Sequence, residues 1–196
     1  MAGRQETLLT KIRGCRVCEA HLPHGPRPML TASRSARLLV IGQAPGAKVH
    51  DGGIPWDDRS GERLREWLAL DGALFYDADR VALVPTGFCY PGRGHQGDLP
   101  PRPECAPRWH GHLLRLLTNV RLTLLVGAHA QAYFLGSRRK PTLTATVRAW
   151  TEYFPPYFVL PHPSPRNGIW LGRHPWFERE TLPTLKGHVA AALSGS

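Results

Sequence analysis

The chain has 196 residues, of which 42% are hydrophobic and 20% are charged, a composition typical of a globular protein and unlike that of a disordered chain. No apolar run approaches the roughly 18 residues that a membrane helix needs, and the N-terminal segment lacks the apolar stretch of a secretory signal. We therefore expect a cytoplasmic protein with no membrane partner. The length suits one compact domain over residues 1–196 and is short for two.

The charge is strongly basic. The chain carries 25 Lys and Arg against 15 Asp and Glu, a net charge of +10. Such a balance is typical of proteins that bind the phosphate backbone of nucleic acids. A GC-rich genome that encodes arginine freely would produce a similar excess, so the charge by itself leaves both interpretations open.

Four short apolar runs predict buried strands, because each is about the length of a strand and several end at glycine or proline. They cover residues 37–41, 81–84, 122–126 and 157–160.

Helical patterns separate these strands. Ser60 is in a position to cap a first helix, and Pro107 is well placed as the first residue of a second one. Gly127 leads into a third helix, and a last helix covers much of Phe177 to Leu193 with an interruption near Pro183. The alternation predicts a parallel sheet covered on both faces, in which ligands bind beyond the carboxyl ends of the strands. The three most unusual peptides follow Ile41, Val84 and Leu160, at those ends.

Four cysteines suggest a metal site. Cys15 and Cys18 form a C-x2-C pair, followed by Cys89 and Cys105. Disulfides are rare in the cytoplasm, so metal ligation is the better interpretation. The spacing leaves zinc and an iron–sulfur cluster both open, and small core residues are a third possibility.

Several motifs together resemble the uracil-DNA glycosylase superfamily, in particular its iron–sulfur (family 4-like) branch. The resemblance runs from Cys15 to about Phe177. It rests on the cysteine pattern and on GQAPG at 42–46, GIPW at 53–56 followed by Gly61, and HPS at 162–164. The longer HPSPRN at 162–167 is similar to the single-strand-selective monofunctional branch. The resemblance implies a three-layer α/β/α fold around a central, mostly parallel four-stranded sheet, and a 4Fe-4S cluster, more than zinc, on Cys15, Cys18, Cys89 and Cys105.

The implied function is base-excision repair. The protein would act as a monomer, associated with the nucleoid, on DNA that contains a deaminated base, uracil in the first place. It would flip the nucleotide into a pocket and hydrolyse its N-glycosidic bond. Two alternatives stay open: a glycosylase mainly for hypoxanthine or xanthine, and a catalytically silent iron–sulfur protein that binds DNA.

The resemblance also implies roles for single residues. His162 would donate a hydrogen bond to the base oxygen, and Trp56 would stack on the flipped base. Structural roles, in which His162 holds its loop and Trp56 fills the core, are the alternatives. Backbone and side chains of two motif loops would contact the substrate: Gly42, Ala44, Pro45 and Gly46 in the first loop, and Ser164, Arg166 and Asn167 in the second. Arg166 would wedge into the base stack or hold a phosphate, and the Ser60 region is a further phosphate candidate.

The chain departs from the family at three positions. Gln43, a candidate catalytic residue, replaces a glutamate. Ala44 stands where the best-known branch has a catalytic aspartate, and Pro85 replaces the asparagine that reads uracil. We therefore expect Asp57 or Asp58 to activate water, with Asp58 alternatively a helix cap. Thr86 and backbone groups beside Pro85 would then read the base edge.

Overall fold

The fold is built around one small parallel sheet. The computed structural model describes residues 2–95 and 97–194, so the ends of the expected domain, residues 1 and 195–196, lie outside the described part. The sheet has the order β2-β1-β5-β6, with every neighbouring pair parallel. Its strands are β1 (Leu38–Ile41), β2 (Val81–Leu83), β5 (Leu122–Val126) and β6 (Tyr157–Leu160). The predicted fold class is therefore confirmed, with strand ends within one residue of those expected.

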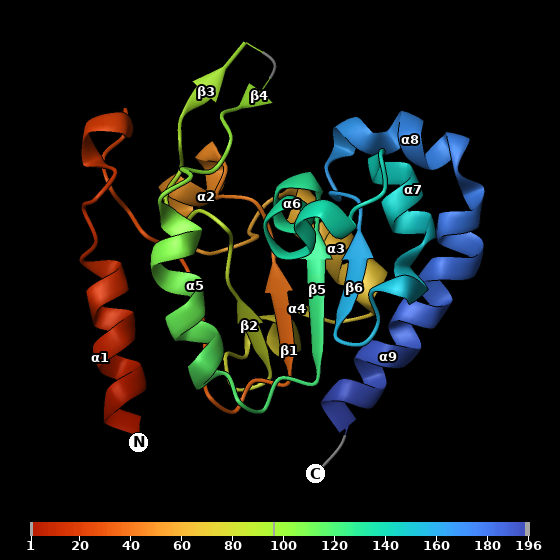
Figure 1. Cartoon of the computed structure of the whole chain (residues 1–196), viewed down its shortest axis with the longest axis horizontal. Helices are drawn as coiled ribbons and strands as arrows, with labels where there is room; N and C mark the ends of the chain where they lie inside the picture. The colour runs from red at the N-terminus through yellow and green to blue at the C-terminus, as the bar shows by residue number, and fades with distance from the viewer. Residues whose placement is uncertain (1, 96, 195–196) are drawn as a thin grey trace.

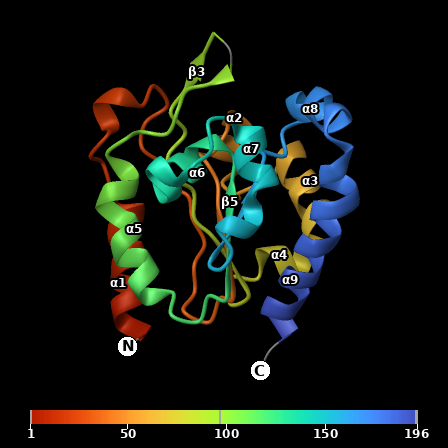
Figure 2. The same cartoon turned by 45° about the vertical axis from the view of Figure 1, so that its right-hand side comes forward.

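Helices cover both faces of the sheet (Figures 1 and 2). One face carries α1 (Ala2–Arg13), α5 (Cys105–Leu116) and α6 (Ala128–Leu135), and α1 lies beside α5. The other face carries α3 (Arg59–Leu68), α4 (Gly72–Tyr76), α7 (Leu143–Arg148) and α9 (Leu182–Ser194). The strand residues are buried on both sides, which explains why each strand is a continuous apolar run.

The remaining elements are short. Two helices flank the carboxyl-terminal edge of the sheet: α2 (Ala47–Gly52) and α8 (Gly168–Arg173). A hairpin of β3 (Arg93–Gly94) and β4 (Gly97–Asp98) rises above that edge (Figures 1 and 2). Single turns are η1 (Glu19–His21), η2 (Gly136–Arg138), η3 (Trp150–Glu152) and η4 (Pro165–Asn167). No helix in the described ranges is long and apolar enough to cross a membrane.

Two predicted helix starts were wrong by one or two residues. The side chain of Asp58, not that of Ser60, caps α3, because its Oδ1 accepts a hydrogen bond from the Gly61 N–H at 2.8 Å. Ser60 lies inside the first turn and is buried. Helix α5 begins at Cys105, so Pro107 is its third residue. The first turn tolerates proline there because its N–H groups have no intrahelical acceptor.

The last helix is interrupted close to the predicted point. A π-helical turn, η5 (Phe177–Thr181), precedes α9, in which Pro183 is the second residue. Pro183 has no N–H to donate into the preceding turn, which favours the wider spacing there.

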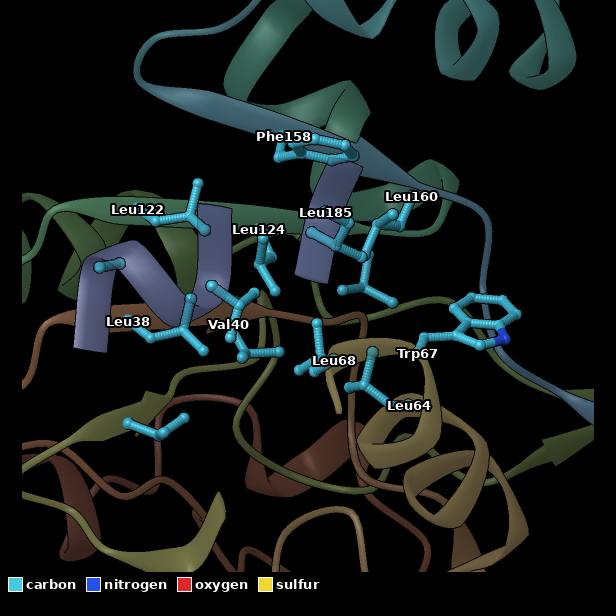
Figure 3. Close-up of a cluster of buried hydrophobic side chains, with 14 of the residues drawn as sticks. Leu38, Val40, Leu64, Trp67, Leu68, Leu122, Leu124, Phe158, Leu160 and Leu185 are labelled. Carbon is cyan, nitrogen blue, oxygen red and sulfur yellow. The ribbon is translucent and has the colours of Figure 1, made fainter. Parts of the chain in front are cut away.

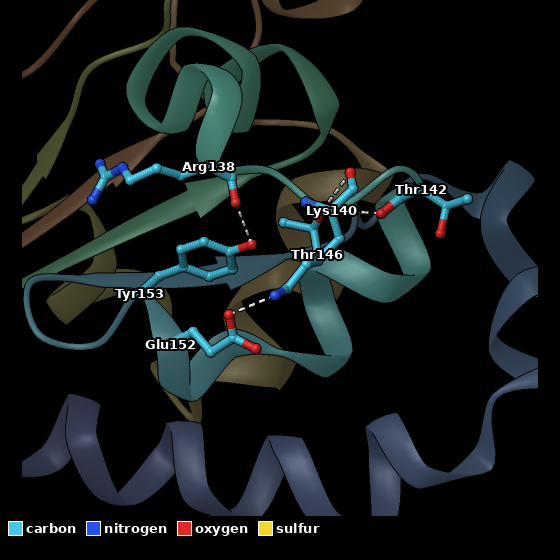
Figure 4. Close-up of polar contacts among 6 residues, drawn as sticks. All are labelled: Arg138, Lys140, Thr142, Thr146, Glu152 and Tyr153. Atoms are coloured by element: carbon cyan, nitrogen blue, oxygen red, sulfur yellow. Dashed lines mark hydrogen bonds and ion pairs between the residues drawn. The ribbon is translucent and has the colours of Figure 1, made fainter.

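The crossover from β5 to β6 is held by polar contacts (Figure 4). The Tyr153 hydroxyl donates to the Arg138 carbonyl at 3.0 Å, and Lys140 pairs with Glu152 at 2.6 Å. Thr146, which is buried, accepts a hydrogen bond from the Lys140 N–H at 3.2 Å. These contacts fix the segment that leads into β6 and so the position of the loop that follows this strand.

Replacing Leu185 with Ala tests the packing of α9 on the sheet. Leu185 is fully buried in the cluster that contains Leu124, Phe158 and Leu160 (Figure 3). We expect the free energy of unfolding to fall by about 2–5 kcal/mol, because the substitution leaves a cavity. Lys186→Ala, at the exposed neighbour, is the control and should change it by less than about 0.5 kcal/mol. Urea denaturation of both variants measures the difference; equal midpoints would contradict this packing.

Candidate active site

A cavity of about 460 Å³ opens at the carboxyl-terminal edge of the sheet. Its walls come from the loops after β1, β2 and β6, from the segment between α2 and α3, and from the β3–β4 hairpin. All but two of the predicted catalytic and substrate-binding residues line it: Gly42, Gln43, Ala44, Pro45, Gly46, Trp56, Asp58, Pro85, His162, Ser164, Arg166 and Asn167. Motifs far apart in the sequence therefore meet at one site.

Asp57 and Thr86 are the two that do not line the cavity. Asp57 is exposed, whereas its neighbour Asp58 faces the cavity. Thr86 is buried, and its hydroxyl lies 2.6 Å from the Gln43 carbonyl and 3.1 Å from the Gly42 carbonyl. A hydroxyl has one proton to donate, so Thr86 ties the first motif loop to the loop after β2.

His162 follows β6 and presents one nitrogen as a donor. The Ser164 N–H donates to Nδ1 of His162 at 3.2 Å, so Nδ1 carries the lone pair and Nε2 carries the proton. Burial lowers the pKa of His162 to about 4; the charge of Asp58 acts in the opposite direction and His129 in the same one. The imidazole is therefore neutral at physiological pH, with a fixed tautomer.

Trp56 forms a wall beside His162. The two rings stack with centroids 5.7 Å apart, and the indole also lies against Gly42, where a Cβ would come within 2.7 Å of it. Trp56 has a φ of +62°, which costs a non-glycine residue roughly 1–2 kcal/mol. The Tyr76 hydroxyl donates to its carbonyl at 3.2 Å, and Gly61 packs so closely that any side chain there would overlap that carbonyl. Its surroundings therefore force this conformation.

The HPSPRN loop is held from several directions. The Asn167 amide donates to the His162 carbonyl at 2.6 Å, and Arg63 of α3 donates to the Ser164 carbonyl at 3.1 Å. The Ser164 hydroxyl accepts from the Arg166 N–H at 3.3 Å. The guanidinium of Arg166 lies against Gly97 of the hairpin. Asn167 thus positions His162, and Arg166 reaches across to the hairpin.

Sequence reasoning missed several residues of the cavity wall. Met29, Val49, Gly97 and Asp98 line it and belong to none of the motifs, whereas Pro55 lies within GIPW but was given no role. Met29 is placed because its N–H donates to the Phe88 carbonyl at 2.8 Å. The one available signal for the hairpin was the glycine-rich stretch between Cys89 and Cys105, which is typical of turns.

His110 is a further residue that the sequence analysis missed, and it lies behind the cavity wall. It is buried, stacks on Phe88, and its Nε2 lies 2.9 Å from the Pro85 carbonyl. Burial lowers its pKa to about 4. The neutral ring therefore donates to this carbonyl and fixes the backbone at Pro85.

The four cysteines surround a second, smaller cavity. Cys15, Cys18, Cys89 and Cys105 all line it as free, half-buried thiols. The segments before β1 and on either side of the β3–β4 hairpin meet there. Within residues 2–95 and 97–194, no group of three or more His, Cys, Asp or Glu side chains is arranged so that it could hold a metal ion.

The thiols have the chemistry of metal ligands. Burial raises the pKa of Cys89 to about 11 and that of Cys105 to about 12. Backbone N–H groups point at both sulfurs, that of Phe88 at 3.4 Å from Cys105 Sγ and that of Arg27 at Cys89. Such N–H donors stabilise thiolate ligands of a metal or cluster. A bound cation would favour the deprotonated form of these buried thiols, so their chemistry, though not their present arrangement, is that of metal ligands.

The pH dependence of His162 is a direct test of the site. We expect an NMR titration of its ring to show a midpoint near pH 4, with His162→Asn identifying the resonance. Because the unfolded-state pKa is near 6.5, the folded protein binds fewer protons between these values. The contribution to stability is therefore complete above pH 6.5 and is lost as the pH falls from about 6.5 to about 4. A midpoint near 6.5 would contradict the buried, neutral imidazole.

Comparison with known families agrees with this geometry. The family model described as the uracil DNA glycosylase superfamily matches residues 28–186, which include the first motif loop, the β3–β4 hairpin and the HPSPRN loop. The match identifies the superfamily and no branch within it. It supports a DNA glycosylase, a hydrolase of base-excision repair with DNA as its substrate. The chain belongs to the uracil DNA glycosylase superfamily.

Proposed function

We propose that this protein excises a deaminated base, uracil as the main substrate, from DNA and leaves an abasic site. The observation that carries the proposal is the Nε2–H tautomer of His162, held neutral in a cavity walled by Trp56 and the first motif loop. A cavity of about 460 Å³ falls within the usual size range of ligand sites. The proposal rests on this donor geometry and on the family.

The reaction produces an anionic base and a cationic sugar, and the site has a group to stabilise each of them. When the bond between C1′ and the base nitrogen breaks, its electron pair goes to the base and the sugar becomes cationic. His162 Nε2–H would donate to a carbonyl oxygen of the departing anion. Water then adds to C1′ and loses a proton, and the anionic base takes up a proton from solvent.

Asp58 is our proposed acceptor for the proton of the water. Its Oδ1 caps α3 through Gly61, which holds the carboxylate in place while its second oxygen is left for the cavity. The negative charge would also stabilise the cationic sugar. Asp58 thus combines the two roles that the sequence offered as alternatives. Asp57 is exposed and outside the cavity lining, so we assign it no catalytic part.

Trp56 and Arg166 would act on the nucleotide as a whole. The indole offers an aromatic face on which the flipped base stacks. Arg166 and Ser164 lie at the rim of the cavity, where a guanidinium and a hydroxyl can hold phosphates. The net charge of +10 would attract the DNA backbone in a salt-dependent manner.

A second candidate substrate is hypoxanthine or xanthine. Pro85 brings no side-chain amide to the cavity, and the Thr86 hydroxyl is engaged with the first motif loop. An amide that selects uracil is therefore lacking at that position, which favours a broader range of deaminated bases.

We further propose that Cys15, Cys18, Cys89 and Cys105 hold a 4Fe-4S cluster. A cluster of this type takes four cysteine thiolates, and these four thiols share one cavity. The cluster would be structural, because it would tie the segment after α1 to both ends of the hairpin loop.

Substitutions at His162 and Asp58 test the mechanism. His162→Ala should lower single-turnover excision of uracil from an oligonucleotide by about 10²-fold or more, as loss of an oxyanion donor does. Asp58→Asn keeps the size and much of the capping ability, so the rate should fall by at least about tenfold while the melting temperature barely changes.

Asp57→Asn is the matched control, since it makes the same chemical change on an exposed neighbour. It should excise at the wild-type rate. Wild-type rates for both Asn variants would exclude a carboxylate of this loop from the mechanism, and an unaffected His162→Ala would remove the central donor.

The metal content tests the cluster. Protein purified without oxygen should be brown, with a broad visible absorption band and about four irons per chain. Cys89→Ala should lower thermal stability far more than the excision rate per folded molecule, because the cluster joins distant segments. Stoichiometric zinc without iron, or colourless and equally stable wild-type and variant proteins, would exclude it.

A further inference from the structure

Asp98 is a second carboxylate in the cavity, and none of the motifs contains it. It is the last residue of β4, in the loop between Cys89 and Cys105, and its side chain lines the same cavity as His162 and Asp58. The catalytic scheme above gives it no task. A charged carboxylate in a cavity for an uncharged base is expected to have a polar partner there.

The backbone at Asp98 is well held. Asp98 pairs with Arg93 across the hairpin, and the next residue, Leu99, donates its N–H to the Gly92 carbonyl at 2.9 Å. Gly97 has a φ of +133°, and its missing side chain leaves room for the guanidinium of Arg166. The hairpin is thus braced against the HPSPRN loop on the cavity side.

The carboxylate lies over the first motif loop. A Cβ at Gly46 would come within 3.2 Å of Oδ2 of Asp98, so glycine leaves the space that the carboxylate needs. The Tyr90 hydroxyl, whose pKa is raised by burial and then by the charge of Asp98, stays protonated beside it. Asp98 therefore enters the cavity from a different segment than His162 does.

The two groups have complementary chemistry. His162 Nε2–H is a donor, whereas an ionised carboxylate only accepts hydrogen bonds. Uracil, hypoxanthine and xanthine each have a carbonyl next to a ring N–H. Cytosine and adenine have a lone pair on the corresponding ring nitrogen, which a carboxylate would repel. A donor and an acceptor-only group in one cavity thus match the edge that uracil, hypoxanthine and xanthine share with thymine and guanine, and reject cytosine and adenine.

Gln43 and Asp58 are less suited to this distinction. The amide of Gln43 carries both donors and an acceptor, so it can satisfy either kind of base edge. Asp58 caps α3 through Oδ1, and the proposed mechanism already uses its second oxygen for the water. From these observations, and resting on the proposed glycosylase function, we infer that Asp98 determines base specificity by accepting a hydrogen bond from a ring N–H of the excised base.

The experiment removes the acceptor and the donor separately. Single-turnover excision is measured from single-stranded oligonucleotides that contain either uracil or 3-methyluracil, which lacks the ring N–H. The wild-type protein should excise uracil far faster than 3-methyluracil. Asp98→Ala should slow uracil excision by about 10- to 100-fold, the value of one hydrogen bond to a charged group. It should also reduce the preference for uracil by at least tenfold.

Two further variants complete the test. Asp98→Asn keeps an acceptor oxygen in the same volume, and its preference should lie between those of the wild type and Asp98→Ala. Asp51→Asn is the control, because Asp51 is also near Tyr90 but is exposed on α2 and does not line the cavity. It should keep the wild-type preference.

The outcomes separate this inference from the proposed function. If the wild-type protein excises uracil but Asp98→Ala slows both substrates by the same factor, Asp98 does not contact the ring N–H and the inference is wrong. If the wild-type protein excises neither uracil, hypoxanthine nor xanthine, the proposed function fails and takes the inference with it. A reduced preference in Asp98→Ala alone, with unchanged Asp51→Asn, supports it.

Discussion

Parallel pairing of neighbouring strands throughout the sheet β2-β1-β5-β6 is the constraint on which the site depends. Parallel strands place their carboxyl ends at one edge, so the loops after β1, β2 and β6 must meet there. Burial of both sheet faces holds this arrangement, since helices of the two outer layers pack on alternate residues of each strand. The loops can then be irregular and rich in glycine and proline without loss of position, because their ends are fixed by the sheet.

Close packing at that edge positions the aromatic wall and the hydrogen-bond donor of the site. Gly42 and Gly61 leave room for Trp56, whose ring stacks against His162 despite its own unfavourable φ. The tautomer of His162 depends in turn on one backbone N–H two residues later. Strain and hydrogen bonding of this kind persist only where the surroundings enforce them, and they are concentrated here beside the proposed reaction centre.

The charge of the cavity lining differs in sign from the net charge of the chain. The chain is strongly basic overall, which suits a polyanionic partner, yet Asp58 and Asp98 both line the cavity. The carboxylate of Asp58 suits a reaction that makes the sugar cationic, and a neutral His162 suits a base that leaves as an anion. The proposed cluster would anchor the loop that carries Asp98, because Cys89 and Cys105 flank this loop.

The sequence by itself determined the four strands, the outer helices that follow them and most of the cavity wall. Buried parallel strands are continuous apolar runs, and motif residues next to strand ends must share an edge. Only the tertiary structure decided that Asp58 faces the cavity while Asp57 does not. In an irregular loop, the sequence pattern does not predict the direction in which each of two adjacent side chains points. It also decided the hairpin and the position of Asp98. Two-residue strands have no periodicity, and Asp98 is placed beside Gly46 and Tyr90 while its neighbour Gly97 lies against Arg166 of the HPSPRN loop. Such contacts depend on packing between distant segments, which local sequence does not encode.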